Sequence, residues 1–104
     1  MQTDHRIIFS SAAHMAELAE ESIGLVVTSP PYPMIEMWDE CFGRQDEKIA
    51  GLLDQAAAQE AWERMHRCLD PVWEEIHRVL IPGGFACINI GDATRTLGSQ
   101  FRLC

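Results

Sequence analysis

The chain has 104 residues, of which 47% are hydrophobic and 23% charged, a composition typical of a globular domain and too apolar for a disordered chain. This length allows one domain at most, and no apolar run reaches the roughly eighteen residues that a membrane-spanning helix needs. Eight basic residues stand against sixteen acidic ones, so the net charge is −8, which argues against tight nucleic-acid binding by this piece alone.

The first 28 residues are predicted to form two strands with a helix between them. Residues 6–10 are rich in β-branched and aromatic side chains, which favour a short strand. In residues 12–21 the apolar side chains recur at helical spacing. Residues 23–28 are an apolar run that stops at two prolines, as a strand buried in a parallel sheet stops at its carboxyl end. The start of the chain lacks the apolar core of a signal peptide, which predicts a cytoplasmic protein.

The remaining residues are predicted to form a loop, a long helical crossover and a third strand. The loop covers residues 30–44, and apolar side chains at helical spacing follow it from Ile49. Asp70-Pro71 fits an N-cap followed by proline at the first helical position, so a new helix is predicted to begin there. Pro82-Gly83-Gly84 is predicted to end that helix, and residues 85–90 to form the strand that Gly91-Asp92 leaves.

This order of elements predicts an α/β fold. We expect a partial doubly wound, Rossmann-like sheet of about three parallel strands with crossover helices. Such sheets bind ligands at the carboxyl ends of their strands, which here means the loops at residues 29–32 and 91–92. Gly83-Gly84 follows a helix and precedes a strand, the reverse of a dinucleotide fingerprint, and is interpreted as structural.

The spacing of the cysteines and histidines predicts no metal site, and the tryptophans are predicted mainly to be core residues. The four cysteines are evenly spread without a Cys-x-x-Cys pair, and the four histidines lack ligand spacing, so reduced, partly buried thiols are expected. Trp62 and Trp73 lie at helical spacing and are predicted to be core residues, whereas Trp38, in the loop, is a candidate for the site.

The stretch Ser29-Pro30-Pro31-Tyr32 has the composition of an amine-binding loop. Its two prolines fix the backbone and remove two N–H donors, which leaves carbonyl oxygens facing a ligand beside the serine hydroxyl. The tyrosine offers a flat face for stacking. Accepting both hydrogens of an exocyclic amine localises its lone pair and stabilises the charge that develops during attack. Taken alone, the motif is equally well an ordinary strand-ending turn, and its place after an apolar strand favours the functional interpretation.

Several segments in the right order resemble the amino-methyltransferases that use S-adenosylmethionine. Residues 25–32, Leu-Val-Val-Thr-Ser-Pro-Pro-Tyr, resemble motif IV of that family, and residues 78–84 and 89–92 resemble the segment downstream of it. Residues 7–11 lie where related enzymes have a strand ending in Gly-Asp. This chain has Ser-Ser there, and Ser11 is the candidate cofactor-binding residue by that resemblance.

The resemblance implies the N-terminal portion of a site-specific DNA methyltransferase of the restriction–modification type. Serine at the first position of the motif is typical of N4-cytosine enzymes, and N6-adenine activity is the close alternative. The methyl donor would be S-adenosylmethionine, and the substrate double-stranded DNA with its target base flipped out of the stack. Ser29 and the Pro30 carbonyl would bind the amine, Pro31 would hold the shape of the loop, and Tyr32 would stack on the base.

The glycine-rich cofactor loop of the family, Phe-x-Gly-x-Gly, does not occur in residues 1–104. The chain is therefore interpreted as a single partial methyltransferase domain without the cofactor loop or the target-recognition region, and as inactive when isolated. The alternative is a truncated product or half of a split enzyme that acts as a self-associating module. A partial sheet leaves edges and helix faces uncovered, so a homodimer or a complementing chain is expected.

Overall fold

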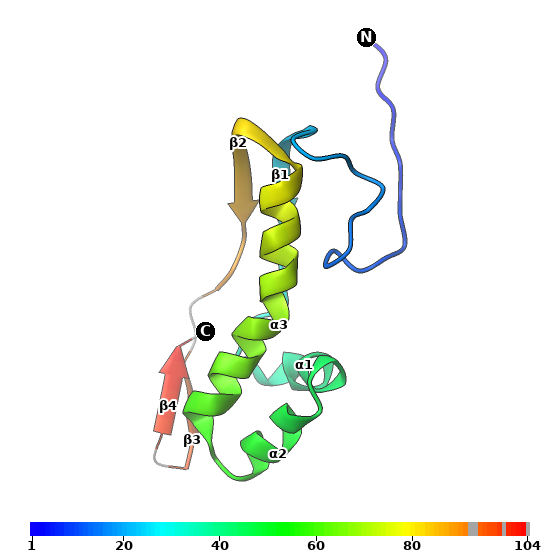
Figure 1. Cartoon of the computed structure of the whole chain (residues 1–104). Helices are drawn as coiled ribbons and strands as arrows, with labels where there is room; N and C mark the ends of the chain where they lie inside the picture. The colour runs from blue at the N-terminus through cyan, green and yellow to red at the C-terminus, as the bar shows by residue number, and fades with distance from the viewer. Residues whose placement is uncertain (92–93, 99, 104) are drawn as a thin grey trace.

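The computed structural model describes residues 1–91, 94–98 and 100–103, and its parallel strands are joined by a long helical crossover (Figure 1). Asp92, named above at the exit of the last predicted strand, lies outside the described residues. In chain order the elements are β1 (Ile23–Thr28), the 3₁₀ helix η1 (Glu36–Trp38), α1 (Asp39–Gln45), α2 (Lys48–Asp54), α3 (Ala58–Val79), β2 (Leu80–Ile88), β3 (Thr94–Leu97) and β4 (Gln100–Leu103).

Strands β1 and β2 form a parallel pair that begins irregularly and then runs in regular register. Ile23 is paired with Leu80, but Leu25 is paired with Phe85, so β2 bulges over residues 81–84. Glycine is required in this bulge: Gly83 has a φ of +79°, and a Cβ on Gly84 would lie 3.0 Å from a backbone oxygen. Beyond the bulge the pairing continues without irregularity to Thr28 and Ile88.

One helix, α3, connects the part of the molecule that contains α1 and α2 to the parallel sheet. The predicted new helix at Asp70-Pro71 was wrong, because α3 runs through Pro71 without a break. Proline removes one backbone hydrogen bond there, but the apolar face continues on both sides of it, with Met65 and Leu69 buried before it and Ile76 and Val79 after it. The helix ends at Val79, and β2 already includes the Pro-Gly-Gly segment that was predicted to end the helix.

Residues 1–22 form neither the predicted strand at 6–10 nor the predicted helix at 12–21. The segment consists of extended backbone and turns, and the side chains of Ile7 and Phe9 are 80% and 96% exposed. A strand requires hydrogen-bonded partners, and the described parallel sheet contains only β1 and β2. The parallel strand predicted at residues 6–10 is therefore absent, and an antiparallel hairpin that was not predicted, β3–β4, is present among the described residues.

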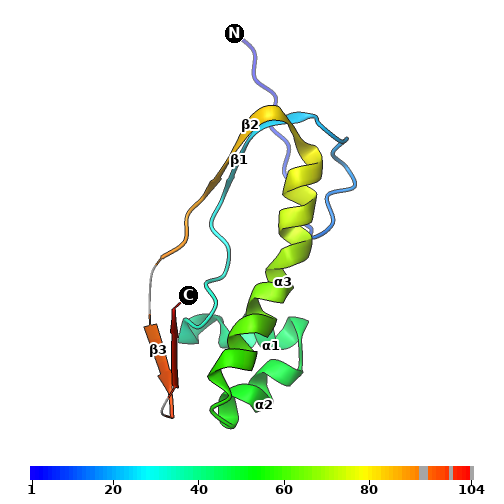
Figure 2. The same ribbon diagram turned by 60° about the vertical axis from the view of Figure 1, so that its left-hand side comes forward.

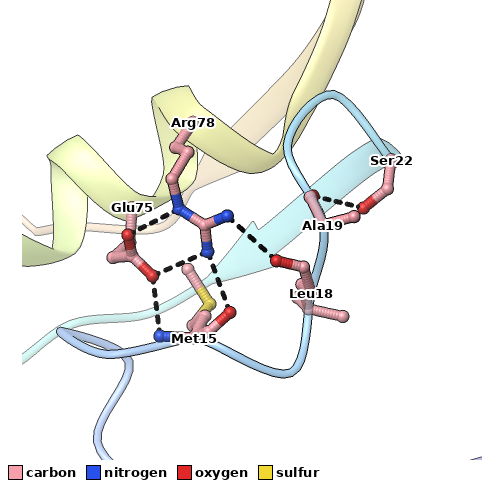
Figure 3. Close-up of polar contacts among 6 residues, drawn as sticks. All are labelled: Met15, Leu18, Ala19, Ser22, Glu75 and Arg78. Carbon is pink, nitrogen blue, oxygen red and sulfur yellow. Dashed lines mark hydrogen bonds and ion pairs between the residues drawn. The ribbon is translucent and has the colours of Figure 1, made fainter.

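A salt-bridged pair on α3, Glu75 and Arg78, holds the segment before β1 (Figure 3). The Arg78 guanidinium donates to Glu75 and to the carbonyl oxygens of Met15 and Leu18, the last two at 2.9 Å. The Glu75 carboxylate accepts the Met15 N–H at 2.7 Å. Of these three backbone groups, only the Met15 carbonyl would have a partner inside a helix over residues 12–21, because the other two would lie in its unpaired first and last turns.

The contacts of Glu75 with Arg78 and the Met15 N–H, called here the Glu75 clamp, predict that the stability of the fold depends on pH. Hydrogen bonds from Arg78 and from the Met15 N–H lower the pKa of Glu75 from 4.5 to about 2. Because the folded pKa is depressed, the clamp contributes its full stability above pH 4.5 and loses it as the pH falls towards 2. Thermal unfolding should therefore show Glu75→Gln less stable than the parent above pH 4.5, with the difference shrinking as the pH approaches 2. A difference that is constant with pH would contradict this role.

The apolar core lies below the sheet, where α1, α2 and the first half of α3 meet. Its fully buried side chains include Phe42, Ile49 and Met65, and Trp38, Trp62 and Trp73 pack against it partly buried. Core positions for Trp62 and Trp73 are thus confirmed, and Trp38 belongs with them. The predicted loop over 30–44 was too long, because η1 and α1 occupy its second half to bury Phe42.

No helix among the described residues is long and apolar enough to cross a membrane. Cys41, Cys68 and Cys87 are free thiols, the first two half-buried and the third exposed.

Candidate functional site

The Ser29–Tyr32 loop follows β1 directly and lies beside the end of β2. The Asn89 N–H donates to the Thr28 carbonyl at 2.8 Å, so the parallel pairing extends one step beyond the strands. The two loops that were predicted at the carboxyl ends of neighbouring strands are therefore adjacent in space, as far as Gly91. This arrangement follows from parallel pairing, which brings both strand ends to the same edge of the sheet.

Within the loop, the serine hydroxyl and the tyrosine ring lie on the same side. Ser29 Oγ is 3.5 Å from the Tyr32 hydroxyl oxygen, and either group can act as the donor. Ser29 is exposed, Pro31 and Tyr32 are half-buried, and Pro30 is buried. The groups that solvent reaches most readily are thus a small hydroxyl and one part of an aromatic ring, which together suit a flat ligand with a polar edge.

The downstream end of the loop is anchored in the core. The Ile35 N–H donates to the Tyr32 carbonyl at 3.2 Å, which closes a turn. Inside this turn the side chains of Pro33 and Met34 are buried, and the Met34 N–H lies 3.2 Å from the Met65 sulfur of α3. Met34 has a φ of +67°, a conformation that non-glycine residues rarely adopt unless their surroundings hold them there. Core packing therefore fixes the position of Tyr32.

The Tyr32 ring also packs on the backbone of Gly91. A Cβ built on Gly91 would lie 3.2 Å from Cε2 and 3.7 Å from Cδ2 of the ring. From the sequence, Gly91 was interpreted only as the residue where the chain leaves a strand, so this contact was not predicted. The sequence did contain a signal for this contact. Gly91 is a small residue just past the end of one strand, and Tyr32 is an aromatic residue just past the end of the neighbouring strand.

Ser11, the candidate cofactor residue, does not adjoin the loop in this structure. It is exposed, and its Oγ accepts the Ala13 N–H at 3.2 Å. The hollow that it helps to line, about 190 Å³, is formed by residues between 8 and 18. Its neighbour Ala12 lines a second hollow of about 310 Å³, which runs between β1 and α3 and reaches Thr28.

The second hollow does not by itself fit S-adenosylmethionine. Thr28 is the one polar side chain among the described residues of its lining, and the others are Ala12, Met15, Leu18, Ile23, Leu25, Val26, Val27, Val72, Ile76 and Val79. A cofactor with an ammonium, a carboxylate and a sulfonium requires polar partners that this lining does not supply. Among the described residues, no group of three His, Cys, Asp or Glu side chains is placed to hold a metal ion.

A larger hollow, about 600 Å³, lies elsewhere, between α1, α2 and β3. Asp39 and Arg95 form an ion pair of 2.6 Å in its wall and tie the hairpin to α1. No residue of the Ser29–Tyr32 loop belongs to its described lining, so its size does not make it the site.

Known proteins match this chain over nearly all of its length. A DNA methylase family model for N6 and N4 enzymes matches residues 23–102, a range that contains the Ser29–Tyr32 loop and Gly91 but not Ser11. The type II methyltransferase M.MjaI of Methanocaldococcus jannaschii is 51% identical over 112 residues, which cover 97% of this chain and 37% of that protein.

A second type II methyltransferase, M.MthZI of Methanothermobacter thermautotrophicus, is 50% identical over 104 residues, which cover 99% of this chain and 29% of that protein. The chain thus spans about a third of the length of the curated relatives that it matches. No solved structure gives a significant match.

Proposed function

Because the chain belongs to the DNA methylase family, we propose that it is the amine-binding, N-terminal portion of a site-specific DNA methyltransferase. The observation that carries this proposal is the Ser29 hydroxyl beside the Tyr32 ring, 3.5 Å from hydroxyl to hydroxyl, at the carboxyl end of β1. The substrate is double-stranded DNA, and the names of both relatives favour an enzyme of a restriction–modification system. Since that DNA is the DNA of the cell, the cytoplasm is the proposed location.

In the proposed reaction the loop acts on the exocyclic amine of a flipped base. Ser29 accepts one amine hydrogen, the Pro30 carbonyl accepts the other, and the lone pair is thereby localised on the nitrogen for attack on the methyl group. As the nitrogen–carbon bond forms, the bond from the methyl group to the sulfonium sulfur of the donor would break, and the nitrogen would lose one proton. Pro31 holds the loop backbone, and Tyr32 stacks on the ring of the base. Pro30 is buried and Ser29 is exposed, so the base is proposed to approach the loop from the side of Ser29. Serine at the first position favours cytosine N4 over adenine N6.

S-adenosylmethionine supplies the methyl group when it is bound in the complete enzyme. The proposed domain, residues 1–104, contains no Phe-x-Gly-x-Gly segment, and the hollow beside β1 offers it one polar side chain. The cofactor site is therefore proposed to be formed mainly by residues outside this chain, with Ser11 as a candidate contributor.

This division predicts that the 104-residue chain alone does not bind S-adenosylmethionine usefully. Calorimetric titration should give no saturable heat at cofactor concentrations that saturate a whole methyltransferase. A dissociation constant in the range of about 1 μM, equivalent to roughly −8 kcal/mol, would contradict the proposed division.

A second candidate function, a self-associating module or half of a split enzyme, is favoured by the open face of the sheet. Leu25 is paired with Phe85 and Val27 with Cys87, so these four side chains share one face of the β1–β2 pair. Leu25, Phe85 and Val27 are 56%, 71% and 73% exposed. Figure 2 shows α3 running along one side of the pair. We propose that a second copy of the chain, or a complementing chain, covers this face.

The proposed function is tested in a completed methylase, in which residues 1–104 replace the matching segment of M.MjaI. The completed methylase should transfer labelled methyl groups from S-adenosylmethionine to DNA that carries the target of the relative. A completed methylase that folds and binds the cofactor but leaves the DNA unlabelled would refute the proposed function.

A further inference from the structure

The tyrosine of the loop makes contacts with Ser29, with Ile35 and with Gly91, which follows the end of the neighbouring strand. Its hydroxyl faces Ser29, its carbonyl closes the turn with Ile35, and its ring rests on Gly91. The first two contacts are local in sequence, whereas Gly91 lies 59 positions away and is placed by the β1–β2 register. The position of the Tyr32 ring therefore depends on how the ends of β1 and β2 are aligned.

Glycine at position 91 supplies space and not backbone freedom. The described glycines with positive φ are Gly83 and Gly98, so Gly91 has a backbone conformation that any residue can adopt. The position excludes larger residues because the ring occupies the place of the missing side chain, with only 3.2 Å between a Cβ and ring carbon Cε2. Carbon atoms in optimal contact are about 3.5–4.0 Å apart, so a side chain there must displace the ring by a few tenths of an ångström.

We propose that Gly91 is a positioning residue for Tyr32: it sets the place of the ring relative to the Ser29 hydroxyl, and so the width of the space that receives the base. This inference rests on the proposed function, because the base is the ligand of that space. Gly91 does not touch the reacting atoms. It acts through the ring, which stacks on the base while Ser29 holds the amine.

The contact can be measured without any activity, because Tyr32 is the single tyrosine of the chain. NMR of the chain with tyrosine labelled at the ε positions of the ring gives one ring signal when the ring flips rapidly, and Gly91→Ala should shift it. Gly51→Ala is the matched control, since a Cβ on Gly51 has nothing within 4 Å and lies in α2. Gly51→Ala should leave the ring signal unchanged. An unshifted signal in Gly91→Ala would overturn the inference.

The role towards the base is measured by a double-mutant cycle in the completed methylase. Gly91→Ala should lower kcat/KM about tenfold, because small misplacements of groups that orient a substrate are costly. In a Tyr32→Ala background the same change should have almost no further effect, since no ring remains to displace. A full additional loss in that background, or parent activity in the single variant, would overturn the inference. If the completed methylase with all native residues is inactive, the proposed function fails and the role towards the base fails with it, while the ring signal still decides the packing.

Discussion

Replacing Ser29 with alanine should lower methyl transfer by the completed methylase by a factor of about 100 or more. The Ser29 hydroxyl is the exposed polar group of the loop, and it is proposed to accept an amine hydrogen as charge develops in the transition state. Removal of one preorganised polar contact of this kind typically costs about 100-fold to 1,000-fold in rate. Ser29 packs no core side chain, so the free energy of unfolding should change little.

Ser22→Ala is a suitable control for this prediction. Ser22 is also exposed, and its hydroxyl donates to the Ala19 carbonyl at 2.7 Å (Figure 3). Ser22 precedes the first residue of β1, whereas the loop follows the last one. This variant should retain the rate of the parent, and both variants should show the same thermal unfolding. If Ser29→Ala retained methyl transfer within a few-fold of the parent, the loop would not be the site.

The second large effect is expected in the association of the isolated chain. Sedimentation at micromolar concentration should show a dimer or a larger assembly, because the face of the sheet formed by Leu25, Val27, Phe85 and Cys87 is open. The radius of gyration of the chain, 16.2 Å, also exceeds that of a compact domain of this length, which is about 13 Å. A chain this extended leaves apolar surface that a second copy can cover.

A lysine introduced on the open face tests whether this surface, and not another exposed apolar residue, forms the interface. Phe85→Lys should weaken the dimer by about tenfold or more, because a lysine ammonium would be desolvated in the interface. Met37→Lys is the matched control: Met37 is 75% exposed, similar to Phe85 at 71%, but it lies in η1 away from the sheet face. A stable monomer of the parent chain, or equal weakening by both variants, would show that this face is not the interface.

Some elements could be predicted because their signals are local. The apolar run at 23–28 ends at two prolines, which can neither donate to a ladder nor continue the strand, and β1 has the predicted bounds. The family assignment from the Ser-Pro-Pro-Tyr motif and its downstream segments is confirmed by the family match and by both relatives. In each case the residues that carry the signal are neighbours in the sequence.

Other elements depended on contacts between distant residues and were missed. Residues 6–10 have strand composition but find no strand to pair with in the described chain, and residues 12–21 are held by Glu75 and Arg78, about sixty positions away. Pro71 looked like the start of a helix, yet tertiary packing of the apolar face carries α3 through it. The contact between Tyr32 and Gly91 follows from the strand register, which the sequence pattern alone does not specify.

The identity of the methylated nucleoside tests most directly whether this loop binds an exocyclic amine. DNA treated with the completed methylase and S-adenosylmethionine is digested to nucleosides, which are separated, identified and quantified by mass spectrometry. The loop chemistry predicts N4-methylcytosine in the product of the parent, and at least about 100-fold less of it with Ser29→Ala. Methyl groups on a ring carbon of cytosine, or N4-methylcytosine formed equally by both proteins, would contradict the account.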